Sequence, residues 1–187
     1  MAAVSVLFIL TPEMKTTVYI GTSLDGFIAR KDGNIDWLVQ FADEEAVQSY
    51  EEFIRRIDAI VIGRGTFEKV ISFPSWPYDK KVFVLSNSIK QVPETVRAKV
   101  TVLAMEPGEL VNYLSGKGFS RVYIDGGNVI QGFLKADLID ELIISKAPVL
   151  IGSGIPLFDY LPKDLSFIHI RTKVHGNGLV RSYYERG

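Results

Sequence analysis

An arginine between two glycines follows a buried apolar run, in the segment Gly63–Thr66 (Gly-Arg-Gly-Thr). The run before it, Ala59–Ile62, is rich in β-branched residues and predicts a buried strand. Glycine allows a tight turn and close approach by a ligand, and the guanidinium of Arg64 suits a phosphate. If a short helix begins near Thr66, its free N–H groups also attract an anion. The segment indicates either half of a nucleotide phosphate site or a strand-to-helix turn with a surface arginine.

Two further predicted strands end in loops of a similar kind. Lys81–Leu85 ends in Ser-Asn-Ser, and Arg121–Ile124 ends in Asp-Gly-Gly-Asn, where another helix is expected to begin. Because parallel strands align their carboxyl ends, the three loops should converge at one edge of the sheet, where open α/β sheets bind ligands. Helix N-termini, an arginine and small hydroxyl groups suit a pyrophosphate with its sugars. The residues expected to bind the nucleotide are Gly63, Arg64, Gly65, Thr66, Ser86, Asn87, Gly126, Gly127 and Asn128.

The elements around these loops alternate between strand and helix. Apolar runs predict the remaining strands, and apolar residues spaced three and four apart predict the helices. Further strands are expected at 16–20, 27–29, 99–103 and 139–144, and helices at 43–56, 67–70, 107–116 and 128–134. Strands at 167–174 and 179–184 form a final hairpin around His175–Gly178. This alternation predicts an α/β fold with a largely parallel sheet and a C-terminal antiparallel hairpin.

Composition excludes several classes of function. The chain has 187 residues, enough for one domain, and its net charge of -1 gives no overall field that would attract nucleic acid or an anionic membrane. It has no cysteine, which excludes disulfides, thiolate zinc sites and a cysteine nucleophile. We therefore expect a cytoplasmic protein with a small-molecule substrate, no bound metal, and neither nucleic acid nor membrane as a partner.

The first residues differ from the rest of the chain. Val4–Leu10 is apolar but too short to span a bilayer, and no positively charged side chain precedes it. Met14 followed by Lys15 resembles an alternative start. We predict that residues 1–14 are a dispensable N-terminal extension and that residues 15–187 form a single domain; a cleaved signal is the alternative.

Known nucleotide-binding fingerprints are absent, but a family resemblance is present. The chain lacks both G-x-G-x-x-G and G-x-x-x-x-G-K-[ST], which disfavours an ordinary Rossmann fold and a P-loop protein. Five segments in order resemble the dihydrofolate-reductase-like superfamily, and within it the reductase domain of bacterial riboflavin biosynthesis. These segments are Ser23–Ala29, Gly63–Glu68, Leu85–Asn87, Asp125–Gly127 and Ala147–Phe158. The resemblance covers roughly residues 15–184, nearly the whole chain.

The resemblance implies a mixed sheet of about eight strands, NADPH as cofactor, and often a homodimer. By matching position, Gly63, Arg64 and Thr66 are expected to hold cofactor phosphates. Arg64 would favour the 2′-phosphate, and therefore NADPH over NADH. Ser86 would lie near the adenosine, and Gly126–Asn128 would carry the pyrophosphate.

Reduction of a ring carbon–nitrogen system also needs a proton source, for which a buried carboxylic acid with a raised pKa is suited. Asp25, in a Ser-Leu-Asp-Gly turn, is the first candidate, and a turn aspartate that caps its own backbone is the alternative. Asp36, beside Trp37, is the second candidate, and a surface turn residue is its alternative. Dihydrofolate reductase has an acid on its first helix that has no clear counterpart here, which disfavours folate as substrate.

The remaining expectations concern the substrate. Trp76 lies between two prolines and could flank a substrate ring, or simply pack over the core. Gly152 and Ser153 could let the backbone approach the substrate, or belong to an ordinary loop. The zinc deaminase motifs that often accompany the riboflavin reductase are missing, so only the reductase half is present.

The leading hypothesis is an NADPH-dependent reductase of a ribosylaminouracil phosphate, which receives hydride at the sugar C1. A dihydrofolate or pteridine reductase is the enzymatic alternative. A non-catalytic nucleotide-binding module is the alternative from another class.

Overall fold

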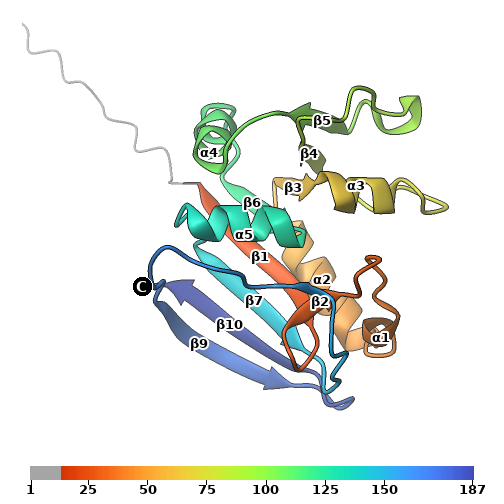
Figure 1. Ribbon diagram of the computed structural model, residues 1–187, viewed down its shortest axis with the longest axis vertical. Coiled ribbons are helices and arrows are strands. Elements are labelled where there is room, and N and C mark those ends of the chain that lie inside the picture. Colours follow the sequence, from red (N-terminus) through yellow and green to blue (C-terminus); the bar gives the residue numbers. More distant parts are fainter. Residues whose placement is uncertain (1–13) are drawn as a thin grey trace, which may run out of the picture.

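A computed structural model describes residues 14–187 and contains one eight-stranded sheet (Figure 1). Across the sheet the strands are β5 (Val100–Leu103), β4 (Lys81–Leu85), β3 (Ala59–Gly63), β6 (Arg121–Asp125), β1 (Lys15–Thr22), β7 (Glu141–Lys146), β10 (Val180–Arg186) and β9 (Phe167–Val174). The first six run parallel, and β10 is antiparallel to both of its neighbours. The predicted fold is therefore confirmed: an α/β fold with a mostly parallel sheet and a C-terminal antiparallel hairpin.

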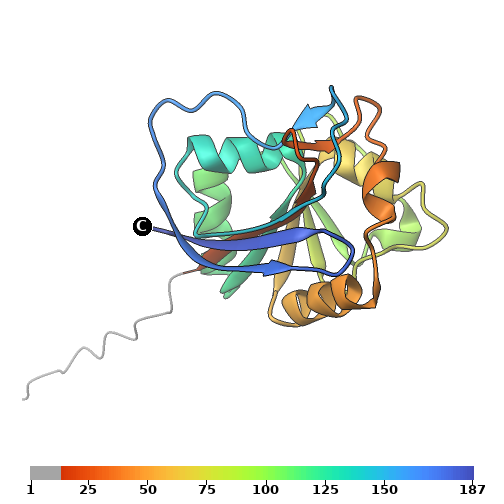
Figure 2. The same cartoon turned by 90° about the horizontal axis from the view of Figure 1, so that it is seen from below.

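Helices cover both faces of this sheet (Figures 1 and 2). They are α1 (Asp36–Val39), α2 (Glu44–Arg55), α3 (Arg64–Val70), α4 (Pro107–Gly116) and α5 (Gly127–Lys135), with a short 3₁₀ helix at Glu94–Val96. On one face, Leu110 of α4 and Phe133 of α5 belong to a buried cluster. On the other face, Phe53 of α2 and Phe67 of α3 belong to a second one. Each such buried side chain contributes roughly 1.5–3 kcal/mol of hydrophobic stabilisation.

Local sequence explains where α2 begins and why β3 lies at the centre. The side chain of Asp43 accepts a hydrogen bond from the Ala46 N–H at 2.8 Å, which caps a first turn that also carries Glu44 and Glu45. The apolar run of β3 has both neighbouring strands and both faces covered, and its residues 59–62 are fully buried. Its loop is therefore held firmly at the carboxyl edge of the sheet.

The structure differs from the expected elements in three places. Helix α3 begins at Arg64 rather than at Phe67, so the arginine is its first residue. A separate short helix, α1, precedes α2. The predicted loop 147–158 contains a two-residue strand, β8 (Ile155–Pro156), which pairs with β2 (Phe27–Ala29) in a second small sheet. A strand of this length, half of it proline, has no periodic pattern that a sequence could reveal.

The predictions for residues 1–13 lie outside the described residues. Met14, the last residue of the predicted extension, is 7 % exposed and belongs to the buried cluster beneath α4 and α5. The packed domain therefore includes one residue more than the predicted boundary at Lys15. Within residues 14–187, no helix has the length and apolar character needed to cross a membrane.

Candidate functional site

The loops after β3 and β6 touch each other at the carboxyl edge of the sheet. Gly126 has a φ of +92°, and a Cβ built on it would lie 2.5 Å from the Thr66 hydroxyl oxygen. Similarly, a Cβ on Gly63 would lie 3.0 Å from a methyl carbon of Val129. The glycines at these positions therefore allow α5 to begin directly against the loop of α3, as the convergence of loops predicts.

The loop after β4 completes this group. Nη1 of Arg64 lies 3.4 Å from the Ser88 hydroxyl, which lies 3.3 Å from the Ser86 hydroxyl. The Ser86 hydroxyl also accepts the N–H groups of Ser88 and Ile89 at 3.1 and 3.2 Å, so it shapes its own loop. Asn87 is exposed at the tip. An arginine and two hydroxyl groups thus lie together at the ends of β3 and β4.

The start of α5 lies beneath a close contact with the small second sheet. A Cβ on Gly127 would lie 3.0 Å from Ile155 and 3.2 Å from Ile28, so a larger residue would push β2 and β8 away. Asn128 is exposed, as is Gly65 on α3, where no atom lies within 4 Å of a built Cβ. The nine predicted nucleotide-binding residues therefore lie on three adjoining loops.

A cavity of about 330 Å³ opens beside Arg64, between α3 and the loop after β4. Besides Arg64, its lining includes Ser88 and Lys90, neither of which was among the predicted nucleotide-binding residues. Glu68 lies 3.7 Å from Arg64, but both side chains are 58 % exposed, so their attraction is weak. The cavity therefore offers two cations and a hydroxyl group to a phosphate-bearing ligand.

Asp25 accepts hydrogen bonds that join its turn to a distant loop. The Ser23 hydroxyl donates to it at 2.5 Å, and the Gly152 and Ile151 N–H groups donate at 2.8 and 3.3 Å. The Ser23 hydrogen bond is the main reason that the pKa of Asp25 lies below its usual value. The side chain is exposed, so it has neither the burial nor the raised pKa that motivated its prediction as proton donor.

Asp36 forms a two-pronged ion pair with Arg30. The two N···O distances are 2.7 and 3.1 Å, and both side chains are substantially exposed. This guanidinium lowers the pKa of Asp36. Asp36 therefore also lacks a raised pKa, and the ion pair gives it a local structural role at the start of α1.

Asp125 has the property that Asp25 and Asp36 lack. It is the last residue of β6, directly before Gly126, whose N–H donates to its Oδ1 at 2.9 Å. Burial raises its pKa to about 6 despite this hydrogen bond. The surrounding side chains include Tyr50 and Tyr78, and burial raises the pKa of Tyr50 to about 12 and that of Tyr78 further. A carboxyl group with a raised pKa therefore lies next to the glycine loop.

The predicted substrate residues lie in different surroundings. Trp76 is half-buried and packs edge-on against Phe67 and Tyr78 at ring distances of 6.2 and 5.4 Å. Its contacts include the α3 side of the core, as the packing alternative expected. Gly152 has a φ of +75° and binds Asp25 through its N–H, and Ser153 beside it is exposed.

Fold and loops together define a dihydrofolate-reductase-like α/β protein. The structure of dihydrofolate reductase from Enterococcus faecalis complexed with NADP(H) aligns over 94% of this chain and 98% of that one, with a TM-score of 0.67 and 17% identity. This likeness concerns the fold.

The family follows from the sequence match. The model of the RibD C-terminal domain matches residues 15–180, and the chain belongs to this family. The uncharacterized protein YwjB of Bacillus subtilis is 36% identical over 182 residues, which are 91% of this chain and 98% of that protein. A crystal structure from Shewanella sp. PV-4, provisionally named as a riboflavin biosynthesis protein, is 43% identical, with a TM-score of 0.87 over 93% of this chain and 99% of that chain.

One relative is longer than this chain, and the match covers only part of it. The riboflavin biosynthesis protein RibD of Corynebacterium ammoniagenes is 27% identical over 155 residues. The match covers 74% of this chain but only 44% of that protein. The chain therefore corresponds to less than half of this RibD protein.

Proposed function

We propose that the chain is an NADPH-dependent reductase whose substrate resembles 5-amino-6-(5-phosphoribosylamino)uracil. The observation that carries the proposal is the meeting of Arg64, Ser86 and Ser88 beside the glycine-lined start of α5. Membership of the RibD C-terminal domain family supports a reductase of the riboflavin pathway. The name of the Corynebacterium relative supports the same pathway.

The described residues fit the proposed cofactor. No side chain caps the start of α5 at Gly126, and free N–H groups at a helix start suit a pyrophosphate. Arg64, with Lys90 in the same cavity, suits the 2′-phosphate that distinguishes NADPH from NADH. When bound, NADPH supplies the hydride of the reaction.

Asp125 is the proton donor in this proposal. In the reaction the ribose C1–O bond breaks, a C–H bond forms at C1, and the ring oxygen takes a proton to become a hydroxyl group. Asp125 can hold such a proton at mildly acid pH because burial raises its pKa to about 6. It also precedes the glycine loop directly, which places it at the edge where the three loops meet. Asp25 keeps a positioning role, because it fixes the 151–152 loop.

Binding is tested first, by fluorescence titration with NADPH and NADH. Wild-type protein should bind NADPH more tightly than NADH, and Arg64→Ala should lose about tenfold in NADPH affinity with little change for NADH. Arg97→Ala is the matched control, since Arg97, directly after the 3₁₀ helix, pairs with Glu94 at 2.6 Å. If neither nucleotide binds, or if both variants behave alike, the assignment of the cofactor site is wrong.

Turnover then separates the candidate functions. Oxidation of NADPH should follow addition of 5-amino-6-(5-phosphoribosylamino)uracil, and dihydrofolate should give a lower kcat/KM. The reverse order would favour the dihydrofolate or pteridine reductase. Tight NADPH binding without turnover of either compound would favour the non-catalytic module.

A further inference from the structure

A polar seam runs between α2 and the C-terminal strands, on the sheet face opposite α5. We use the term polar seam for Glu45, Ser49, Glu52 and Arg56, which recur along α2 and its C-terminal end at the spacing of one helix face. At one end Glu45 meets Lys173 of β9, and Nδ1 of His175 lies 2.9 Å from the Glu45 carboxylate. At this end of the polar seam, the charge of Glu45 is therefore paired with a cation from β9.

One turn further along the polar seam, Ser49 contacts a buried arginine. Arg181 of β10 is 2 % exposed. Its Nε donates to the Ser145 hydroxyl at 2.8 Å, and its Nη1 donates to the hydroxyl of Ser49. Its guanidinium carbon also lies 5.2 Å from the centre of the Tyr19 ring. Both hydrogen-bond partners are neutral, and among residues 14–187 no carboxylate forms an ion pair with Arg181.

A buried charge without a counter-charge is costly, because desolvation of an ion is repaid only by an opposite charge in good geometry. Two serine hydroxyl groups and an aromatic ring repay part of that cost. Nη2 of Arg181 makes no hydrogen bond to any residue in the described range 14–187. The guanidinium of Arg181 therefore retains capacity for an anion.

A cavity of about 260 Å³ lies beside the last part of the polar seam, at Glu52 and Arg56. Its floor is a single row across four neighbouring strands, in which Tyr19 faces Ile143, Ile143 faces Tyr183, and Tyr183 faces Arg171. Arg181 lies two residues before Tyr183 on the same face of β10. Ser49 and Tyr19, which both contact Arg181, also line the cavity.

Charge in and behind this cavity is predominantly positive. Arg171 stacks on Tyr183, with its guanidinium carbon 3.5 Å from the ring centre, and this stacking fixes its orientation over the floor. Arg171 and Arg56 form no ion pair within residues 14–187. Glu52 is the one acidic residue in the lining, against Arg56 and Arg171 in the lining and Arg181 behind it.

We propose that this cavity binds a small oxyanion, a phosphate or carboxylate group, held by Arg171 and Arg56 over the unpaired positive charge of Arg181. Planar guanidinium groups match the two oxygens of such groups, and the stacked Arg171 loses little freedom on binding. The site is separate from the loops at Arg64 and does not depend on the proposed reductase activity. The cavity lies on the same sheet face as Tyr50 and Tyr78.

The test is isothermal titration of the full chain with inorganic phosphate and, separately, with succinate, at equal ionic strength set by chloride. At least one of them should bind. Arg171→Gln should weaken that binding about tenfold or more, as expected for loss of a charged hydrogen-bonding partner. Glu52→Gln should strengthen it, because the competing carboxylate is removed. Whichever anion binds more tightly identifies the phosphate or the carboxylate as the recognised group.

Two controls separate this site from others. Arg55→Gln removes one positive charge at the end of α2, directly before Arg56. Arg55 does not line the cavity, so this variant should leave binding unchanged. Arg64→Ala removes the proposed cofactor phosphate site and should also leave it unchanged. Arg171 and Glu52 are exposed, so both variants are expected to fold, which their circular dichroism spectra would verify.

Several outcomes would overturn the proposal. These are no binding of either anion, binding that is lost with Arg64→Ala, or equal binding in the Arg171 and Glu52 variants. Sedimentation velocity adds another: if the wild type is a dimer that Arg171→Gln dissociates without any added anion, a second copy of the chain covers the cavity instead. A negative result for the oxyanion cavity would not change the expected NADPH titration. A negative NADPH titration would not change the expected anion binding either.

Discussion

Gly126 combines two constraints that only a glycine satisfies. Its φ of +92° is unfavourable for residues with a side chain, and a Cβ would lie 2.5 Å from the Thr66 hydroxyl oxygen. We expect Gly126→Ala to lower the free energy of unfolding by about 1–3 kcal/mol and to weaken NADPH binding, because α5 must move away from α3. Urea denaturation and nucleotide titration would measure the two effects.

The matched control is Gly116→Ala, at the end of α4, where φ is not positive and no atom lies within 4 Å of a built Cβ. There alanine should leave nucleotide affinity unchanged and raise stability by up to about 1 kcal/mol. Equal behaviour of the two variants would contradict the close-contact argument.

Asp125 gives a second prediction at this scale, in its dependence on pH. Its pKa is about 6 in the folded protein against 3.8 for an ordinary aspartate, so between these values the folded state holds more protons than the unfolded state. The contribution of this group to stability therefore falls as pH rises from about 4 to about 6, and is constant above. Asp125→Asn should remove this dependence in denaturation curves measured at a series of pH values.

Activity should follow the same group. If the protonated carboxyl donates, kcat falls as pH rises through about 6, and Asp125→Asn lowers kcat by roughly 10²- to 10⁴-fold. The reference variant is Asp25→Asn, which should change the positioning of the 151–152 loop without moving the pH midpoint. A pH midpoint that shifts with Asp25 rather than with Asp125 would reverse the assignment.

These residues also show what the sequence could and could not predict about the site. The three loops were predictable because strand ends, glycines and an arginine are all local features. The raised pKa of Asp125 was not, because it comes from burial in the folded protein, where the charge of Asp125 also acts on Tyr50 and Tyr78 from distant segments of the chain. Conversely, the sequence suggested Asp25 as a proton donor because it does not reveal the hydrogen bonds from Ser23 and Gly152.

At the scale of elements, the second small sheet is the part that the sequence did not predict. Strand β8 is held to β2 by close backbone packing, and a Cβ on Gly154 would clash with the carbonyl oxygen of Ala29. Backbone cannot move aside as easily as a side chain, so Gly154→Ala should separate the two strands. We expect a loss of about 1–3 kcal/mol in unfolding free energy.

The consequence reaches the proposed site, because Ile28 of β2 and Ile155 of β8 both cover Gly127 at the start of α5. Gly154→Ala should therefore increase hydrogen exchange at 27–29 and 155–156, and weaken NADPH binding as well. Gly108→Ala, where no atom lies within 4 Å, is the control. Unchanged exchange at both segments would show that the contact tolerates a methyl group.

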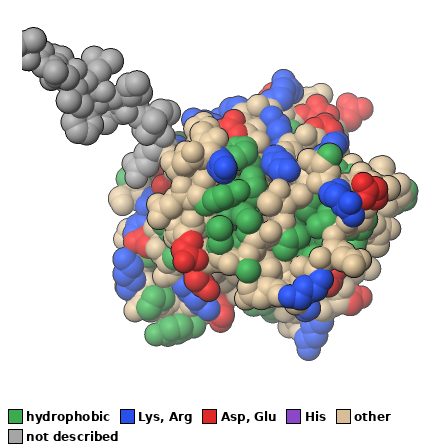
Figure 3. Space-filling view, turned by 90° about the horizontal axis from the view of Figure 1, so that it is seen from above, with side chains coloured by type: hydrophobic (Ala, Val, Ile, Leu, Met, Phe, Trp, Pro, Cys, Tyr) green, Lys and Arg blue, Asp and Glu red, His purple; other side chains and the backbone are tan. Residues whose placement is uncertain are grey.

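At the scale of the whole molecule, most of the architecture followed from periodicity. Alternating strands and helices required a parallel sheet, and the order of the strands placed the three loops side by side. Surface charge is mixed, and the face in Figure 3 shows basic and acidic side chains close together around apolar patches. Long-range polar contacts, in contrast, leave no local pattern. The hydrogen bonds from Arg181 to Ser49 and from Arg186 to Asp137 join segments that are far apart in the chain, so no local sequence pattern predicts them.

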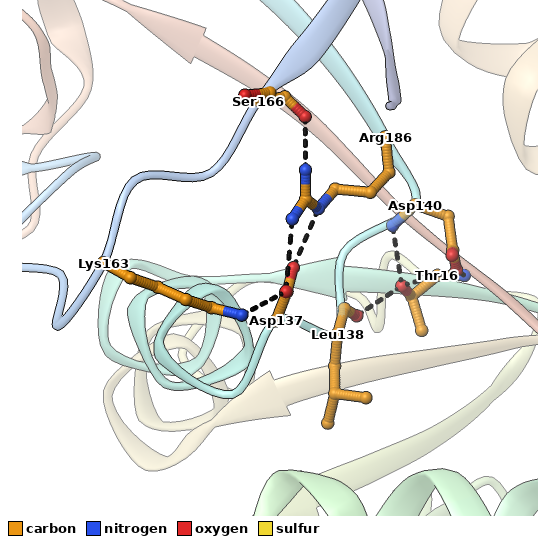
Figure 4. A network of polar contacts seen from close by, with 7 residues as sticks. All are labelled: Thr16, Asp137, Leu138, Asp140, Lys163, Ser166 and Arg186. Carbon is orange, nitrogen blue, oxygen red and sulfur yellow. Dashed lines mark hydrogen bonds and ion pairs between the residues drawn. The ribbon is translucent and has the colours of Figure 1, made fainter.

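The hydrogen bonds between Arg186 and Asp137 connect the C-terminal strand to the segment before β7 (Figure 4). Arg186 of β10 donates to both carboxylate oxygens of Asp137 at 2.8 and 3.1 Å, and Lys163 donates to the same group at 2.8 Å. Asp137 has a φ of +57° in the connection between α5 and β7. Nη1 of Arg186 also donates to the carbonyl oxygen of Ser166, next to the start of β9.

This arrangement predicts how the fold responds to acid. The hydrogen bonds from Arg186, and then from Lys163, lower the pKa of Asp137 well below its ordinary value of 3.8. The stabilisation is therefore fully present above that value and is lost as pH falls below it towards the lower pKa of the folded state. Asp137→Asn keeps a side chain that tolerates positive φ but removes the charge, and should lower the unfolding free energy at pH 7 by about 1 kcal/mol.

Wild type and variant should therefore converge in stability as the pH is lowered, in urea denaturation curves measured from neutral pH down to the acid limit of folding. Asp159→Asn is the control, because its pair with Lys135 is longer, at 3.5 Å, and more exposed. Its effect at pH 7 should be smaller. A constant difference between wild type and Asp137→Asn at every pH would mean that shape, rather than charge, fastens the C-terminal strand.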